Sequence, residues 1–320
     1  MQSQPPSGSD TRWTGIRRAA PVVLGLIFVI GPLVASRAAR AADSADWRRP
    51  AVAATNVRVS AGYDYVSIDK TRTSYFGSGG SATLSIDEVD THAGYAELVA
   101  TLPVTHSSGA RGRVRAGFGD TRRSLDALDP DESDASSYGV ELGLFVRDPK
   151  LGSVTFGGSY DRLEGDGGVD ANAFGGSVEA AIFFPDLGSG YIDWFARFDF
   201  THRRVSGAGQ PFDVDADVYR VAAGAGWYAT EDIQVLAGGR WTRTEEEFLS
   251  EDDREGFLTL RWRLPLPLSL EVSASGSAGL SEYKQAPFRG DHRLIYGARV
   301  GFIYRFRSGP TLRESIRAYD

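Results

Sequence analysis

The chain has 320 residues, a formal net charge of -7, no Cys, and a hydrophobic fraction of 42 % with a mean hydropathy of -0.24. The negative charge argues against a nucleic-acid partner, and without Cys no disulfide holds the fold together. After residue 42 no apolar run is long enough for a membrane-spanning helix, which argues against a helical membrane protein. Composition alone suits a soluble protein and a β-barrel equally.

The first 41 residues have the three parts of a secretory signal. Three arginines precede an apolar stretch over 19–35, and small residues stand at 39 and 41. This order predicts a signal peptide, 1–41, cleaved before Ala42. The alternative is an uncleaved membrane anchor, although the stretch is short for a bilayer span. In both cases the rest of the chain leaves the cytoplasm, and residues 42–55 form a short polar leader in the periplasm.

Twelve segments alternate between apolar and polar residues with the period of a β-strand. The last of them, 292–306, is the clearest, because every second residue is apolar or aromatic and the others are mostly Arg, Gly or polar. A strand of this kind has one face for lipid and one for a polar interior. The predicted strands cover 56–68, 92–104, 112–119, 137–147, 153–163, 174–184, 191–202, 217–228, 233–244, 256–264, 268–280 and 292–306.

The connections between these strands alternate in length. Tight turns with Pro, Gly or Asp are expected at 148–152, 185–190, 229–232 and 265–267. Longer polar loops are expected at 69–91, 120–136, 164–173, 203–216, 245–255 and 281–291. In a transmembrane barrel the short turns face the periplasm and the long loops face outward. An even number of strands then places both ends of the barrel domain, 56–306, in the periplasm.

Aromatic residues lie near the ends of the predicted strands, on the lipid-facing side. Trp and Tyr favour the two interfaces of a membrane because their rings are amphipathic. We therefore expect a lipid-interface girdle, made of Trp194, Trp227, Trp241, Trp262, Tyr304 and Phe306.

These features resemble those of bacterial outer-membrane β-barrel proteins, over residues 56–306. The resemblance implies an all-β, antiparallel, up-and-down transmembrane barrel of about twelve strands. The last strand resembles the assembly signal of such proteins, matched by Arg299, Gly301, Tyr304 and Phe306. It implies recognition by the barrel-assembly machinery and a setting of outer-membrane lipid and lipopolysaccharide. The chain departs from the pattern by continuing as a C-terminal tail, 307–320, expected in the periplasm.

Arginine dominates the inward positions of the predicted strands. Guanidinium groups stay charged and bind carboxylate and phosphate through two hydrogen bonds, so an Arg-lined lumen favours small anionic solutes. The sequence thus predicts a narrow channel, and leaves open a closed structural or surface-interaction barrel in which arginines and carboxylates pair. The predicted lumen residues are Arg113, Arg115, Arg197, Arg220, Arg240 and Arg261.

A third interpretation is a lipid-modifying enzyme of the outer membrane. His92, His202 and His292 are all expected at the extracellular rim, where a general base is conceivable. His202 and His292 occupy the alternate strand positions that are predicted to face lipid. No Ser or Asn stands two residues away on the same strand. We therefore assign no catalytic residue. The acidic loops lack the spacing of a calcium loop, and no metal or cofactor is predicted.

Overall fold

The computed structural model describes residues 55–77, 80–105, 107–125, 131–148, 151–166, 169–184, 191–207, 214–247, 249–264, 267–283, 288–289, 292–306 and 311–318. The predicted signal peptide and nearly all of the predicted leader lie outside these residues.

Twelve long strands and one two-residue strand form a single antiparallel sheet. The outer-face and inner-face residues alternate along each long strand, as the sequence period requires. The strands are β1 (Asn56–Gly77), β2 (Gly80–Pro103), β3 (Ser108–Leu125), β4 (Asp131–Asp148), β5 (Gly152–Gly165), β6 (Val169–Phe183), β7 (Tyr191–Gly207), β8 (Val214–Thr230), β9 (Ile233–Glu246), β10 (Leu249–Arg263), β11 (Leu268–Tyr283), β12 (Phe288–Arg289) and β13 (His292–Arg305).

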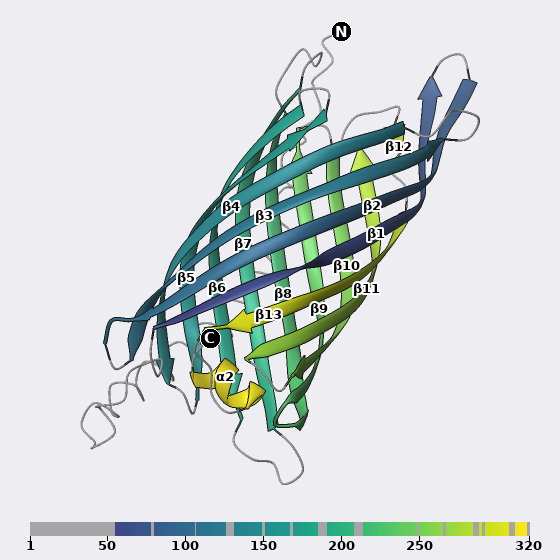
Figure 1. Ribbon diagram of the computed structural model, residues 1–320. Helices are drawn as coiled ribbons and strands as arrows, with labels where there is room; N and C mark the ends of the chain where they lie inside the picture. The colour runs from purple at the N-terminus through teal and green to yellow at the C-terminus, as the bar shows by residue number, and fades with distance from the viewer. Residues whose placement is uncertain are drawn as a thin grey trace.

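The sheet closes on itself to form a barrel (Figure 1). Strand β1 pairs with β2 on one side and with β13 on the other, for example Tyr63 with Gly94 and with Val300. Every other long strand pairs with its neighbours in order of sequence. Closure leaves the long strands without a free edge over the barrel wall, which is how a β-sheet satisfies its backbone groups in lipid.

Large apolar side chains cover the outside of the barrel. Phe118 is 73 % exposed, and Leu142 and Leu144 on β4 are 67 % and 68 % exposed. Their neighbours of opposite parity, such as Glu141 and Arg113, point into the lumen and pair with each other at 3.0 Å. An apolar outside and a charged inside is the reverse of a water-soluble protein, and it matches a surface in contact with hydrocarbon.

The strands extend further than the sequence pattern indicated. Residues 69–91 were expected to be a loop, but β1 continues to Gly77 and β2 begins at Gly80, with Tyr75 paired to Ala82. This hairpin projects from one end of the barrel (Figure 1). Strands β3 to β11 likewise run into the ranges expected to be loops. Polar residues on both faces hid these extensions, because beyond the membrane neither face needs apolar side chains.

Short turns join the strands at the opposite end, which is the periplasmic end in barrels of this architecture. Between β4 and β5, the Leu151 N–H donates to the Asp148 carbonyl at 3.1 Å and to its side chain at 3.2 Å. Gly152 then has a φ of 147°. A Cβ there would lie 2.0 Å from the Ala181 carbonyl oxygen on β6, so only glycine fits.

A short helix, α2 (Leu312–Ala318), follows the last strand. The tail 307–320 had been expected only to be periplasmic, and its helix was not predicted. Thr311 accepts a hydrogen bond on Oγ1 from the Glu314 N–H at 3.2 Å, so it caps the N-terminus of the helix in a Thr-x-x-Glu sequence. No helix among the described residues is long and apolar enough to cross a membrane.

Candidate functional site: the arginine-rich lumen and its periplasmic mouth

A network of arginines and carboxylates crosses one side of the lumen. Glu97 is shared by Arg58, at 3.2 Å, and Arg113, at 3.3 Å. Glu141 is shared by Arg113, at 3.0 Å, and Arg197, at 3.4 Å. Arg197 on β7 pairs with Glu141 on β4, and these two strands are not neighbours. The two side chains therefore meet inside the lumen and fill part of it.

The other predicted lumen arginines lie inside as well, most of them in ion pairs. Arg115 pairs with Asp161 at 2.6 Å, Arg240 with Glu255 at 3.0 Å, and Arg261 with Glu271 at 2.6 Å. Arg220 differs from them, because it is exposed to the lumen and has no ion pair or hydrogen bond with any other described residue. The sequence did not reveal which carboxylates these arginines meet.

Three cavities follow one another inside the barrel. The first, of about 390 Å³, is lined by residues of β1, β7, β9, β10, β11 and β13, including Arg240 and Glu255. It shares Arg261, Glu271 and Arg299 with a second cavity of about 400 Å³. A third cavity, of about 270 Å³, shares Arg58, Arg113 and Arg261 with the second and lies at the periplasmic end. Arg261 lines all three.

Helix α2 lies across the periplasmic mouth (Figure 1). Arg147 on β4 donates to the carbonyl oxygens of Ile316, at 2.7 Å, and Arg317, at 2.5 Å. Arg317 pairs with Asp193 on β7 at 2.5 Å. Arg263 on β10 donates to the Ser315 hydroxyl at 3.1 Å. Because β4, β7 and β10 are spaced around the barrel, these contacts hold the helix over the opening.

Burial is greatest where α2 meets the barrel wall. Leu312 and Ser315 are 0 % and 1 % exposed, and Asp193 on the wall is 8 % exposed. At the start of the helix, the Leu312 N–H donates to the Asp232 carboxylate at 3.0 Å. The Arg313 guanidinium lies over the Tyr191 ring, 3.4 Å from its centroid. The helix is thus a packed part of the structure, held mainly by charged and polar contacts.

The residues of the predicted assembly signal also have structural roles at the seam between β13 and β1. Arg299 points inward, pairs with Asp64 at 2.5 Å, and lies over the Tyr95 ring. Gly301 faces Gly62 across the seam. A Cβ on Gly301 would lie 2.3 Å from the Tyr95 hydroxyl, and one on Gly62 would lie 2.7 Å from the Tyr95 ring. These two glycines make room for Tyr95.

The residues of the predicted girdle lie on the outer face. Trp194, Trp227 and Trp262 are about half exposed, Tyr304 and Phe306 are exposed, and Trp241 is half-buried. The rings of Tyr304 and Phe306 pack edge to face, with centroids 5.1 Å apart.

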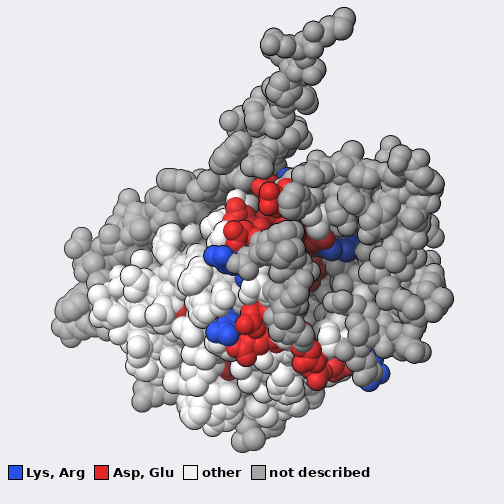
Figure 2. All heavy atoms as spheres, turned by 90° about the horizontal axis from the view of Figure 1, so that it is seen from above, with Lys and Arg blue, Asp and Glu red and all other residues white. Residues whose placement is uncertain are grey.

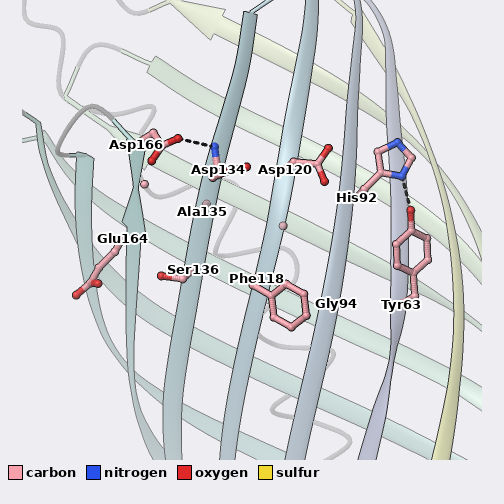
Figure 3. A pocket seen from close by; sticks show the side chains of 12 residues that line it. Tyr63, His92, Gly94, Phe118, Asp120, Asp134, Ala135, Ser136, Glu164 and Asp166 are labelled. Carbon is pink, nitrogen blue, oxygen red and sulfur yellow. Dashed lines mark hydrogen bonds between the residues drawn. The ribbon is translucent and has the colours of Figure 1, made fainter.

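The two described rim histidines lie outside the barrel. His92 shares a hydrogen bond with the Tyr63 hydroxyl and lines an outer pocket of about 690 Å³ with Phe118, Asp120 and Ser136 (Figure 3). His202 pairs with Asp217 at 2.9 Å. Within the described part of the chain neither ring is hydrogen-bonded to a serine, and no group of His, Asp or Glu is arranged to hold a metal ion. His292 has no described side chain.

Acidic side chains gather at the extracellular end (Figure 2). On the inner face, Glu251 and Asp253 on β10 both pair with Arg293, at 2.9 Å and 2.7 Å. On the outer face, Glu245 and Asp252 pair with Arg243, at 2.8 Å and 3.3 Å. The charge of the rim thus contrasts with the arginines that line the periplasmic end of the lumen.

A closed antiparallel barrel with an exposed apolar wall, aromatic residues near the strand ends and a charged interior defines an outer-membrane β-barrel. This chain is a twelve-stranded protein of that class.

No family model matches the chain, and no curated protein matches it. Among solved structures, it is similar to the β-domain of the Bordetella autotransporter BrkA, at 13 % identity and a TM-score of 0.47, over 77 % of this chain and 100 % of that one. The translocator domain of the autotransporter NalP from Neisseria meningitidis is 13 % identical, with a TM-score of 0.44, over 90 % and 100 % of the two chains. An outer membrane channel from Pseudomonas putida F1 is 10 % identical, with a TM-score of 0.39, over 78 % and 95 %.

Proposed function

We propose that this protein is a narrow channel of the outer membrane that passes small anionic solutes and is closed at its periplasmic mouth by α2. The observation that carries the proposal is the series of three lumen cavities, which adjoin through shared arginines. A solute that passes through the three cavities stays next to Arg261, which lines each of them. Guanidinium groups in a narrow pore lower the energy of anions relative to cations.

The unpaired Arg220 supports the same proposal. It faces the lumen with no ion pair to a described residue, and Asp199 opposite it on β7 is already held by Arg197 at 2.7 Å. Its charge is therefore available to a passing anion. The predicted lumen residues act together in the proposal: Arg113, Arg115, Arg197, Arg220, Arg240 and Arg261.

A second candidate is a closed structural barrel. The ion pairs between β4 and β7 and the helix across the mouth favour it, because both reduce the open cross-section.

Planar-bilayer recordings of refolded protein separate the two candidates. We expect rare openings of the full chain and steady conductance of a chain that ends at Phe306, with a reversal potential in a salt gradient that shows anion preference. No conductance from either form contradicts the channel, and cation preference contradicts the role of the arginines. Arg220→Gln is expected to reduce the anion preference, whereas Arg162→Gln, on the outer face, leaves it unchanged.

Export and assembly follow from the same proposal. Residues 1–41 direct secretion, and cleavage occurs before Ala42. The strand that carries Arg299, Gly301, Tyr304 and Phe306 is the segment offered to the barrel-assembly machinery, with lipid and lipopolysaccharide around the finished wall. Sequencing the N-terminus of protein purified from outer membranes tests the cleavage site, since any residue other than Ala42 at the start contradicts it.

A further inference from the structure

Two aromatic rings lie over a pair of glycines on the inner wall of the barrel. Phe195 on β7, Gly224 on β8, Gly238 on β9 and Phe257 on β10 stand opposite one another across four neighbouring strands. A Cβ on Gly224 would lie 2.7 Å from the Phe195 ring, and one on Gly238 would lie 2.6 Å from the Phe257 ring. The rings therefore occupy the space that the missing side chains leave, with centroids 6.2 Å apart. We call these two rings the aromatic platform.

The aromatic platform forms part of the wall of the first lumen cavity, whose volume is about 390 Å³. Phe195 and Phe257 are both half-buried, so part of each ring is open to the lumen. Leu236 on β9 lines the same cavity. This cavity thus has an apolar wall inside an otherwise charged lumen.

The charged side chains that line the first lumen cavity form ion pairs with one another. These pairs are Arg240 with Glu255 at 3.0 Å, Arg261 with Glu271 at 2.6 Å, and Arg299 with Asp64 at 2.5 Å. Three guanidinium groups balance three carboxylates, so the charges in the lining cancel. The polarity of this cavity therefore favours a solute that forms hydrogen bonds without carrying a net charge.

Paired side chains keep hydrogen-bonding capacity that a hydroxyl group can use. A guanidinium has five N–H donors and a carboxylate has about four acceptor positions, and each ion pair uses only some of them. Thr259, Ser273 and Ser275 add hydroxyl groups to the lining. Ser275 has no side-chain hydrogen bond to any other residue that the structure describes. A solute hydroxyl both donates and accepts, so it can bind either member of an ion pair.

We propose that the first lumen cavity binds a neutral, polyhydroxylated ring, such as a monosaccharide in its pyranose form. The face of an aromatic ring carries partial negative charge, which attracts the polarised C–H groups on one face of a sugar ring. The hydroxyl groups around the sugar ring then reach the serines and the ion pairs. An aromatic hydrocarbon would leave these polar groups without partners, which costs binding free energy.

The size of the cavity agrees with a single sugar ring. Its volume lies at the small end of the range of about 300–1,000 Å³ that ligand pockets occupy. The proposal goes beyond the anion channel and does not depend on it, because a closed barrel has the same cavity.

Saturation-transfer NMR tests the site on the refolded full-length protein in dodecylphosphocholine micelles. The probes are glucose, sorbitol, toluene and succinate. Glucose is expected to bind saturably, and the other three are expected to bind more weakly. Sorbitol lacks the ring, toluene lacks the hydroxyl groups, and succinate lacks both.

Substitutions at Phe257 separate contact with a ring face from simple filling of space. Phe257→Leu keeps an apolar side chain but removes the ring, and it is expected to weaken glucose binding about fivefold. Phe257→Tyr keeps the ring, so the affinity is expected to stay within about twofold of that of the wild type.

Two further variants complete the test. Ser275→Ala removes one hydroxyl group and is expected to weaken glucose binding about threefold. Phe156→Leu is the matched control, because Phe156 lies on the outer face and is 52 % exposed, and it is expected to leave the affinity unchanged.

The outcomes separate this proposal from the channel proposal. No saturable binding of glucose overturns the site, whether or not the protein conducts anions. Equal weakening by Phe257→Leu and Phe257→Tyr overturns the role of the aromatic platform, and succinate binding as tight as glucose binding overturns the neutral solute class. Glucose binding with the expected response to Phe257→Leu, in a protein without conductance, supports the site and contradicts only the channel.

Discussion

The two ends of the barrel are built in opposite ways. At the periplasmic end, five arginines line the cavity next to α2, buried residues surround the helix, and the opening is covered. At the extracellular end, acidic side chains gather around an end that no described helix covers, and the hairpin of β1 and β2 extends outward. In the proposed channel, this difference assigns solute selection and closure to the periplasmic half. The charges of the rim set the electric field that an approaching solute meets first.

The largest expected effect comes from the arginine that joins most carboxylates in the periplasmic half. Arg197 contacts Glu141, Glu179 and Asp199, at 3.4, 3.2 and 2.7 Å. Arg197→Met leaves these carboxylates with fewer counterions, and it is expected to lower the free energy of unfolding by about 3 kcal/mol. Denaturant unfolding in micelles measures the change.

The matched variant at the other end is Arg162→Met. Arg162 pairs with Glu164 at 2.9 Å on the outer face, and both side chains are well exposed. The expected loss is below about 1 kcal/mol. If both variants lost the same free energy of unfolding, ion pairs would stabilise the two ends of the barrel equally. That result would contradict the proposed difference between the ends.

A smaller effect is expected where α2 meets the wall. Asp193 binds Arg317 at 2.5 Å and accepts from the Tyr228 hydroxyl at 2.9 Å. Asp193→Ala is expected to weaken docking of the helix by about 2 kcal/mol, as for the loss of charged hydrogen bonds. Hydrogen–deuterium exchange over residues 312–318 measures the docking, and the open time of the channel is expected to rise with it.

The control for this variant is Glu231→Ala, because Glu231 pairs with Arg313 but its side chain is 53 % exposed. Its effect on exchange is expected to stay below about 1 kcal/mol. If exchange became faster in both variants while the open time of the channel stayed the same, α2 would not be the element that closes the mouth.

The smallest effect is expected at the rim. Glu251→Gln leaves Arg293 with Asp253 alone, so the inner rim becomes less negative and anion conductance is expected to rise modestly at 0.1 M salt. At 1 M salt the Debye length falls to about 3 Å and the gain is expected to vanish. Glu245→Gln, on the outer face, is the control. A gain that persists at 1 M salt would contradict an electrostatic origin.

The sequence was sufficient to predict the barrel, because the alternation of apolar and polar residues is visible within each strand. Alternation along β13 placed Arg299 inside and Phe302 outside, as the structure has them. The ends of the strands were missed where both faces are polar, as in the β1–β2 hairpin, since a period of two is visible only when the two faces meet different surroundings.

The sequence could not predict which carboxylate each arginine inside the lumen pairs with. Arg197 reaches Glu141 across two intervening strands, and this depends on the tilt of the strands and the length of the side chains. Helix α2 was missed although Thr311 and Glu314 have the spacing of a capping box, followed by Arg317 in the last turn. That signal was sufficient to predict a helix, but not its position across the mouth.

The distribution of contacts on α2 also predicts an order of events during biogenesis. Its seven residues are too few for a stable isolated helix, and its partners come from β4, β7, β10 and the turn before β9. We expect those groups to reach their final positions only after β13 has paired with β1, which closes the barrel. We therefore expect the helix to form last, so that its protection from proteolysis reports completed insertion without an added label.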